Sequence, residues 1–176
     1  MELRGDKVLI RPLAEEEAPA ALAFMLENRA FLAQWEPERN ESWFTLEAQR
    51  FDIETALVDG NADRRYSFGI FSDGELVGRI ALNQIYRGIF QNSYLGYSIG
   101  ERWNGRGFAT EAVELAVRFA FEEAGLHRVQ AAVMPRNTAS IRVLEKNGFR
   151  EEGFAVNYLR INGAWEDHRI FARTAD

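Results

Sequence analysis

The chain contains no cysteine among its 176 residues, and this absence excludes several kinds of chemistry. Without thiols it can form no disulfide scaffold, cysteine nucleophile, iron–sulfur cluster or cysteine-ligated zinc site. Histidine is also scarce, because His127 and His168 are the only two and lie far apart in the sequence. We therefore expect a protein that holds no metal ion.

Long apolar runs and targeting segments are absent as well. No stretch approaches the roughly 20 apolar residues that a membrane span needs. The first residues, MELRGDKV, lack the apolar segment of a signal peptide, so a cytoplasmic protein is expected. No linker or repeat divides the chain, and its 47% hydrophobic and 27% charged residues are typical of a globular protein. Residues 1–176 are therefore predicted to form a single domain.

Positive charge is in deficit, with 21 basic against 27 acidic residues and a net charge of −6. This balance disfavours binding to nucleic acid or to an anionic membrane. The deficit lies in residues 1–60, which hold six basic and 13 acidic side chains, whereas the remainder is nearly neutral. A partner that docks on the first third should therefore be cationic or an amine.

Hydrophobic periodicity and turn signals predict a mixed α/β sheet with helices packed on it. Strands are expected at 7–12, 66–71, 76–85, 93–100 and 129–134, and a final hairpin at 155–161 and 165–173 around Asn162-Gly163. Helices are expected from Ala14 to Asn28, from Thr45 to about Val58 with Asp59-Gly60 closing it, from Phe108 to Glu123 before Gly125, and from Thr138 to Lys146 behind an Asn137 cap.

The stretch SYLGYSIGERWNGRGFAT, residues 93–110, carries the strongest chemical signal. A strand runs into a glycine-containing turn and then into a helix N-terminus, where unpaired backbone N–H groups favour a phosphate. Gly105 and Gly107 let the backbone approach an anion closely, and Arg102 and Arg106 add positive charge. The alternative is a glycine turn that binds no ligand.

Two common phosphate motifs can be excluded here. The chain has no Gly-Lys-Ser/Thr triplet, which a Walker loop requires. A dinucleotide fingerprint needs a small residue where Thr110 stands and an acidic residue after the next strand, and the strand at 129–134 contains no acid. What remains is the pattern Arg102-x-x-Gly105-x-Gly107.

This pattern resembles the acetyl-CoA pyrophosphate loop of the GNAT N-acetyltransferases, Q/R-x-x-G-x-G/A. Downstream, Asn137-x-x-Ser140 and the sequence KNGF at 146–149 resemble the family's N-x-x-S helix that ends in N-G-F. The segments LIRPL, ENRAFLAQWEP, LHRVQAAVMPRN and INGAWEDHRIFA are similar to the RimJ/RimL branch, which acetylates the N-termini of ribosomal proteins, and above all to its alanine-specific members. The resemblance spans nearly the whole chain.

The resemblance implies a GNAT fold of about seven mostly antiparallel strands with four helices. In that fold the fourth and fifth strands splay apart and receive the pantetheine arm, and the facing edges map to 97–100 and 129–133. The implied acetyl-CoA ligands are Tyr97, Ser98, Ile99, Gly100, Arg102, Asn104, Gly105, Arg106, Gly107, Phe108, Ala109, Thr110, Asn137, Ser140 and Lys146. Lys146 is open to a second interpretation, a solvated cation that complements the helix dipole.

The resemblance also implies direct attack of a neutral amine on the thioester carbonyl. The backbone N–H of Ile99 would stabilise the oxyanion, and Ser140 would assist the departing thiolate. The alternative for Ser140 is a first-turn serine that bonds its own helix backbone. Because the chain has no cysteine, the acetyl group should pass directly from cofactor to acceptor.

A dedicated general base is missing from the position at which some relatives carry a glutamate, because Leu159 stands there. An α-amine titrates near pH 7.7–8 and a lysine near 10.4, so an α-amine needs less help to lose its proton. A missing base is thus easier to reconcile with an N-terminal acceptor. Water held by Asn83, Tyr97 or Glu36 is a candidate proton relay.

The acceptor pocket is expected between the first two helices, their connector and the last hairpin. Arg29, Trp35, Glu36 and Asn83 are its candidate residues, although Trp35 has a core position as its alternative. Asp167 and His168 are interpreted as polar pairs of the hairpin.

The predicted function is therefore acetyl-CoA-dependent acetylation of a protein N-terminus, such as that of a ribosomal protein. Two alternatives stay open: acetylation of a small amine such as a polyamine, an amino acid or an antibiotic, and a non-catalytic acyl-CoA-binding module. The sequence is compatible with a monomer or a homodimer.

Overall fold

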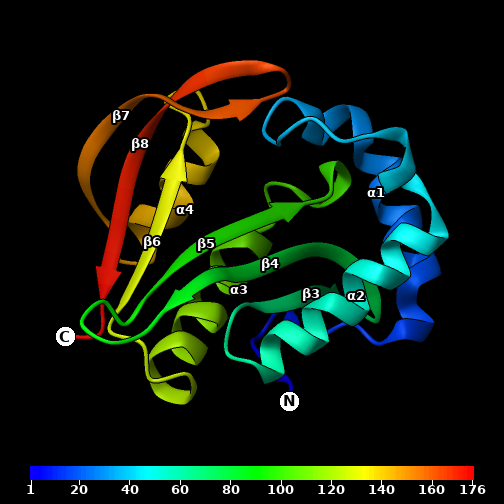
Figure 1. Cartoon of the computed structure of the whole chain (residues 1–176), viewed down its shortest axis with the longest axis horizontal. Coiled ribbons are helices and arrows are strands. Elements are labelled where there is room, and N and C mark those ends of the chain that lie inside the picture. Colours follow the sequence, from blue (N-terminus) through cyan, green and yellow to red (C-terminus); the bar gives the residue numbers. More distant parts are fainter.

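A computed structural model describes residues 1–176 and contains one eight-stranded sheet (Figure 1). Its strand order is β1-β2-β3-β4-β5-β6-β8-β7. The strands are β1 (Leu3–Arg4), β2 (Leu9–Arg11), β3 (Tyr66–Ser72), β4 (Glu75–Tyr86), β5 (Asn92–Ile99), β6 (Arg128–Val133), β7 (Arg150–Ile161) and β8 (Ala164–Thr174). Only β5 and β6 pair in parallel. The predicted mixed sheet is confirmed, and the two-residue β1 is the strand that the sequence did not indicate.

Four helices cover the sheet. The helices α1 (Ala18–Ala33) and α2 (Leu46–Asn61) pack on β4 and β3 on one face, while α3 (Phe108–Arg118) and α4 (Thr138–Lys146) lie on the other (Figure 1). Short 3-10 turns occur at Glu15–Glu17, Glu41–Phe44 and Glu101–Trp103. None of the helices combines the length and apolar character needed to cross a membrane.

Several predicted boundaries were wrong by a few residues. Helix α1 continues past Asn28 to Ala33, because no breaker follows and Leu32 is buried. Helix α2 passes through Gly60 instead of ending at Val58, and the residue that leaves the helix with a positive φ of 56° is Asp63. A glycine ends a helix only where the backbone turns left-handed.

The third predicted helix changes its character near its end. It is α-helical as far as Arg118 and continues as a π-helical turn over Phe119–Glu123, before Gly125 stops it at a φ of 63°. The ring of Phe119 is held edge-on by Tyr66 and Phe68, with centroids 4.9 and 5.3 Å away. The stop at Gly125 is as predicted.

Strands β5 and β6 pair at one end and separate at the other. Their parallel ladder has three residue pairs, from Asn92–Arg128 to Tyr94–Gln130, and none beyond (Figure 1). The predicted splay is therefore confirmed. The predicted edge at 129–133 needs one correction, because Val129 still pairs with Ser93 and the open edge of β6 begins at Ala131.

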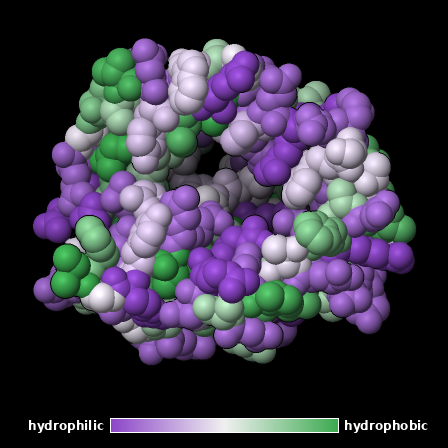
Figure 2. All heavy atoms as spheres, viewed as in Figure 1, coloured by the Kyte–Doolittle hydropathy of each residue, from purple (hydrophilic) through white to green (hydrophobic).

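Beyond the splay, the β6–β8–β7 half of the sheet contacts the segment that follows α1. The hairpin of β7 and β8 arches towards the end of α1, where the Asn162 N–H donates to the Glu36 carbonyl oxygen at 3.1 Å. Arg136, which follows β6, donates to the Gln34 carbonyl oxygen at 3.3 Å and pairs with Glu166 at 3.2 Å. Between the splay and these contacts the surface is deeply hollowed (Figure 2).

Candidate functional site

The edge of β5 that faces the hollow carries unpaired backbone groups. The Gly100 N–H donates to the Val77 oxygen at 2.9 Å. With the register of the two strands, this bond shows which residues of β5 direct their backbone groups towards β4 and which direct them away. In an antiparallel ladder every second residue turns its backbone groups away from the neighbour, and here these residues include Tyr97 and Ile99. Since β6 has already diverged, their N–H and C=O groups face the opening. An extended ligand can pair with this edge as an added strand.

Tyr97 and Ser140 meet at this edge. The Tyr97 hydroxyl lies 2.6 Å from Ser140 Oγ and 3.3 Å from the Ser140 carbonyl oxygen. The Asn137 side chain accepts the Ser140 N–H at 3.3 Å, so it caps α4 as predicted. The Ser140 hydroxyl makes no bond to its own helix backbone and is directed to another polar side chain. The two hydroxyls form one hydrogen-bonded unit beside the open strand edge.

Burial raises the pKa of Tyr97 to about 12, and its bond to Ser140 opposes the rise. The phenol therefore stays protonated throughout the neutral range. A protonated hydroxyl in contact with a second hydroxyl can supply a hydrogen bond, or a proton, to an anion that forms nearby. This is the role expected of a group beside a leaving thiolate.

The glycine loop between β5 and α3 has the conformation that its sequence predicts. Gly105 and Gly107 have φ of 76° and 80°, a region that side-chain-bearing residues seldom adopt. Gly107 is the residue before α3, so the first N–H groups of the helix, from Phe108 to Thr110, lack intrahelical partners. Asn104 folds back to donate to the Gly100 carbonyl oxygen at 3.3 Å. The loop presents donors that suit a phosphate.

The two predicted arginines of the loop differ in their surroundings. Arg106 is exposed, and its side chain has no hydrogen-bond or ion-pair partner. Arg102 instead stacks on Trp103 at 3.9 Å and lies 3.3 Å from Glu27 and 3.4 Å from Glu75. The charge of Arg102 is thus shared with two carboxylates, and Arg106 is the freer cation.

Two residues that sequence reasoning missed hold this loop in place. Lys7 donates from Nζ to the Arg106 carbonyl oxygen at 3.3 Å, and a Cβ built on Gly107 would lie 2.8 Å from that nitrogen. The buried Asn28 accepts the Glu101 N–H at 2.9 Å and donates to the Phe24 oxygen. No local pattern marks either residue, since each acts on a segment at least 70 positions away.

Glu111 anchors the segment that carries Lys7. Its carboxylate accepts the backbone N–H groups of Asp6, Lys7 and Val8 at 3.0, 2.8 and 2.6 Å. The N-terminal segment is thereby fixed to the first turn of α3, where a carboxylate also complements the helix dipole. These bonds hold the backbone of Lys7 beside the glycine loop.

Replacing Lys7 with methionine is expected to raise the KM for acetyl-CoA about three- to tenfold and to leave kcat nearly unchanged. Methionine keeps the apolar stem and removes a cation beside a phosphate-binding loop, and one hydrogen bond to a charged group contributes about 1.5 kcal/mol. Initial rates at varied acetyl-CoA measure this effect. Because high salt screens exposed charges, the difference between the variant and the wild type should shrink as salt increases, and a difference that ignores salt would contradict the assignment.

The end of α4 shows two different situations. Asn147 is buried, and its amide donates to the Thr110 and Val143 carbonyl oxygens at 3.1 and 2.9 Å, which ties α4 to α3. Gly148 follows with a φ of 76°. Lys146 is exposed and its side chain makes no hydrogen bond or ion pair, so both interpretations of this residue stay open.

The predicted acceptor residues are only partly brought together. Arg29 bonds both carboxylate oxygens of Glu41 and stacks on Phe44 at 3.9 Å, so its charge is already paired. Trp35 is half-buried under the guanidinium of Arg136, at 5.4 Å from the ring centre. These contacts engage the guanidinium of Arg29 and one face of the Trp35 ring, and the contact of either residue with an acceptor stays a prediction.

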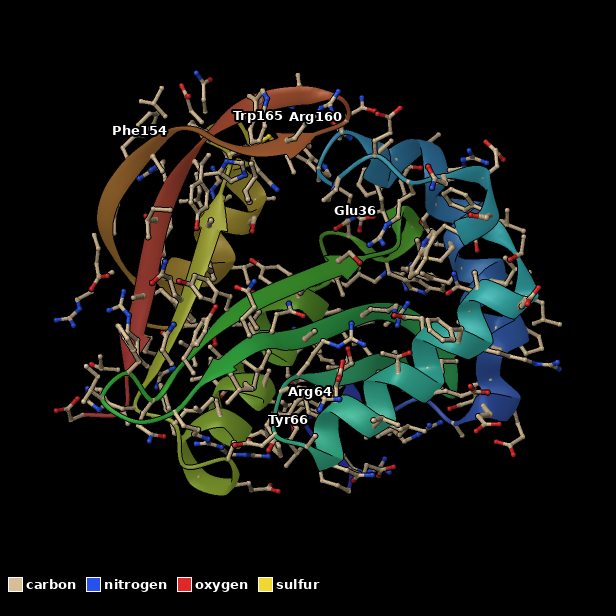
Figure 3. All side chains as sticks on the ribbon, viewed as in Figure 1. Glu36, Arg64, Tyr66, Phe154, Arg160 and Trp165 are labelled. Atoms are coloured by element: carbon tan, nitrogen blue, oxygen red, sulfur yellow. The ribbon has the colours of Figure 1, made fainter.

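The side chains of Asn83 and Glu36 form no hydrogen bond or ion pair within the protein. Asn83 lies next to Gly96, where its Nδ2 is 3.6 Å from the position that a Cβ on Gly96 would take. The carboxylate of Glu36 accepts no hydrogen bond and forms no ion pair, and Figure 3 shows it at the margin of the opening. Both are polar groups available to a second substrate.

The position at which the family resemblance implied a base is apolar in this chain. Leu159 pairs in register with Glu166 and is 41% exposed. Asp167 accepts the Asn157 N–H at 2.9 Å, and the buried His168 lies with Nδ1 2.9 Å from the Glu166 carbonyl oxygen. Asp167 and His168 are thus polar pairs of the hairpin. His, Asp and Glu side chains form no group of three or more that could hold a metal ion.

Comparison with known proteins places this geometry in a family. Residues 7–150 match the model of the acetyltransferase (GNAT) domain. The chain is 44% identical to the "Probable N-acetyltransferase YjcK" of Bacillus subtilis, over 97% of this chain and 95% of the relative. It is 35% identical to the "[Ribosomal protein uS5]-alanine N-acetyltransferase" of Escherichia coli, over 99% and 91%.

A solved structure agrees with these relatives. The RimJ protein of Mycobacterium smegmatis in complex with CoA-disulfide superposes with a TM-score of 0.91 at 32% identity, and the match covers 96% of this chain and 82% of that one. The overall fold is thus shared with a protein whose structure was solved in complex with CoA-disulfide. The chain belongs to the GNAT acetyltransferase family, and within it to the RimJ/RimL branch.

Proposed function

We propose that this chain transfers the acetyl group of acetyl-CoA to the N-terminal α-amine of a ribosomal protein, with residues 1–176 acting as a single catalytic domain in the cytoplasm. The observation that carries the proposal is the unpaired edge of β5, which ends in the glycine loop and has the Tyr97–Ser140 pair beside it. The uS5-alanine acetyltransferase among its relatives supports the class of acceptor.

The proposed ligand contacts follow from the open edge and the loop. The pantetheine arm pairs with the backbone of Tyr97 to Gly100, and the pyrophosphate lies on the N–H groups of residues 104–110. Arg106 and Lys7 supply positive charge there. Asn137 is already committed to capping α4, so its contribution is to hold Ser140 in place.

The chemistry that these groups support is direct acyl transfer. The amine attacks the thioester carbonyl, and the backbone N–H of Ile99, which faces the opening, stabilises the oxyanion. As the C–S bond breaks, its electron pair passes to sulfur, and the Ser140 hydroxyl, bonded to Tyr97, supports the thiolate that forms. No enzyme thioester is needed, because the chain has no cysteine.

A peptide with a free N-terminal alanine and one internal lysine tests this function. We expect one acetyl group on the α-amine and none on the lysine, because the α-amine is far more often unprotonated at neutral pH. The matched control is the same peptide with a formylated N-terminus, which should gain no acetyl group. Robust turnover of spermidine or a free amino acid with none of the peptide would favour the small-amine alternative. Acetyl-CoA binding without any transfer would favour the non-catalytic module.

A further inference from the structure

Glu36 is the one half-buried acid of residues 1–60 whose carboxylate has no partner. The other half-buried acids there, Glu17, Asp52 and Asp59, each pair with an arginine side chain. Glu36 lies just beyond α1, is half-buried, and its carboxylate has no partner. A carboxylate taken out of water without a partner costs free energy, so a group of this kind is often a ligand site.

The backbone holds Glu36 at a defined place. Its carbonyl oxygen accepts the Asn162 N–H at 3.1 Å, and two residues earlier the Gln34 carbonyl oxygen accepts a bond from Arg136. These bonds come from the other half of the sheet, across the hollow. Glu36 is thereby fixed on the margin of the opening, where Figure 3 shows it beside the tip of the hairpin.

Glu36 lies on the opposite side of the sheet from the Tyr97–Ser140 pair. Arg79 bonds Asp52 of α2 at 2.6 Å, so it lies on the face that α1 and α2 cover. Glu36 is close enough to Arg79 for the arginine to influence its ionisation. In the neighbouring strand β5, Ser98 pairs with Arg79 and lies on the same face. Tyr97 is the residue before Ser98, so its side chain lies on the opposite face, where it bonds Ser140 of α4. The two polar groups therefore flank β5 from its two faces.

This arrangement fits the geometry of acyl transfer. A nucleophile approaches a carbonyl from one side of its plane. The hydroxyls of Tyr97 and Ser140 lie on the α4 side of β5, where they would contact the leaving sulfur. An amine that enters from the α1 and α2 side would meet Glu36. On that face β5 presents Gly96 and Ser98, whose small size leaves room for an extended polypeptide.

We propose that Glu36 binds the ammonium group of the acceptor and takes one proton from it before the attack, an inference that rests on the proposed acetyl transfer. The ammonium loses its first proton to Glu36, and the nitrogen lone pair then forms the bond to the carbonyl carbon. The nitrogen loses its second proton as the C–S bond breaks, and the thiolate gains one proton. Glu36 returns its proton to water, so one proton is released in each turnover.

The ionisation of Glu36 suits a proton acceptor. Burial raises its pKa, while the positive charges of Arg39 and Arg79 oppose the rise. Arg79 is itself paired with Asp52, which leaves burial as the larger effect. The raised pKa narrows the gap to an α-amine near 7.7–8, which makes the proton transfer less unfavourable.

The variant Glu36→Gln tests the inference with little change of shape. We expect kcat/KM for the acceptor to fall about 100-fold at neutral pH, with the KM for acetyl-CoA unchanged. In the wild type, activity is lost on the acid side only as Glu36 itself is protonated. In Glu36→Gln only the free amine reacts, so activity should begin to fall below about pH 8. The ratio of the two rates should therefore shrink above that pH.

Two further variants make the result decisive. Glu36→Asp keeps the carboxylate and should recover part of the rate, while Glu38→Gln, an exposed acid two residues on, should match the wild type. The assays use whichever amine the wild type acetylates, so a small-amine acceptor would overturn the proposed acceptor and still test Glu36. Parallel pH profiles for Glu36→Gln and the wild type would overturn the inference alone. Transfer to no amine would overturn both proposals.

Discussion

Replacing Ser140 with alanine is expected to lower kcat about 100- to 1,000-fold, while the KM for acetyl-CoA changes by less than about threefold. The hydroxyl lies 2.6 Å from the Tyr97 hydroxyl, at the strand edge where the proposed thioester lies. An alanine removes the donor that faces the leaving sulfur and leaves Tyr97 without its partner. The loss appears in kcat because the contact strengthens as charge develops on sulfur.

The measurement is simple because the chain contributes no thiol of its own. Release of free CoA can be followed with a disulfide reagent at saturating acceptor, without background from the protein. Thr138→Ala is the matched control, since it removes a hydroxyl from the same turn of α4 that has no side-chain partner. A Ser140→Ala enzyme with wild-type kcat would exclude Ser140 from the proposed chemistry.

Tyr97→Phe distinguishes a hydrogen-bonded unit from two separate donors. We expect a smaller loss than for Ser140→Ala, because Ser140 then keeps its own hydroxyl at the site. The double variant should be little worse than Ser140→Ala alone, since residues that act together give non-additive losses. Strictly multiplied losses in kcat would show that the two hydroxyls act independently.

The features that were predicted correctly depend on residues close together in the sequence. Asn137 caps α4 through an N–H three positions away, and Asn162-Gly163 forms a tight turn with φ of 47° and 81°. Gly105 and Gly107 take up positive φ within one loop. Such local patterns carry their own physical cause, and the family resemblance added the splay of β5 and β6.

The features that were missed depend on distant residues. Lys7 reaches the glycine loop from a segment whose backbone N–H groups, that of Lys7 included, are bound by Glu111. Arg102 fits a phosphate pattern locally, yet the fold brings Glu27 and Glu75 to it. The bond from Asn162 to Glu36 closes the hollow and joins segments that no sequence period connects. In each of these examples, tertiary packing determines which residues contact the site.

Gly78 shows how strictly the site depends on packing between β4 and β5. We expect Gly78→Ala to lower the free energy of unfolding by about 3 kcal/mol, because a Cβ there would lie 2.3 Å from the Ser98 carbonyl oxygen and 2.8 Å from Ile99 Cδ1. The first atom belongs to the backbone and cannot rotate away. Relief requires β5 to move, and β5 carries the open edge that the cofactor needs. Urea unfolding at equilibrium measures the change.

Gly96→Ala is the matched control on the same pair of strands. A Cβ at Gly96 would meet only Asn83 Nδ2, at 3.6 Å, which is an ordinary contact, so the expected loss is below about 1 kcal/mol. Equal losses for Gly78→Ala and Gly96→Ala would mean that the loss comes from replacing any glycine of these strands. The close approach of backbone atoms at Gly78 would then not be its cause. The other outcome is a large loss of stability for Gly78→Ala alone, together with weak binding of acetyl-CoA by the fraction that still folds. That result would show that the contact of β4 with β5 sets the position of the strand edge on which the proposed transfer depends.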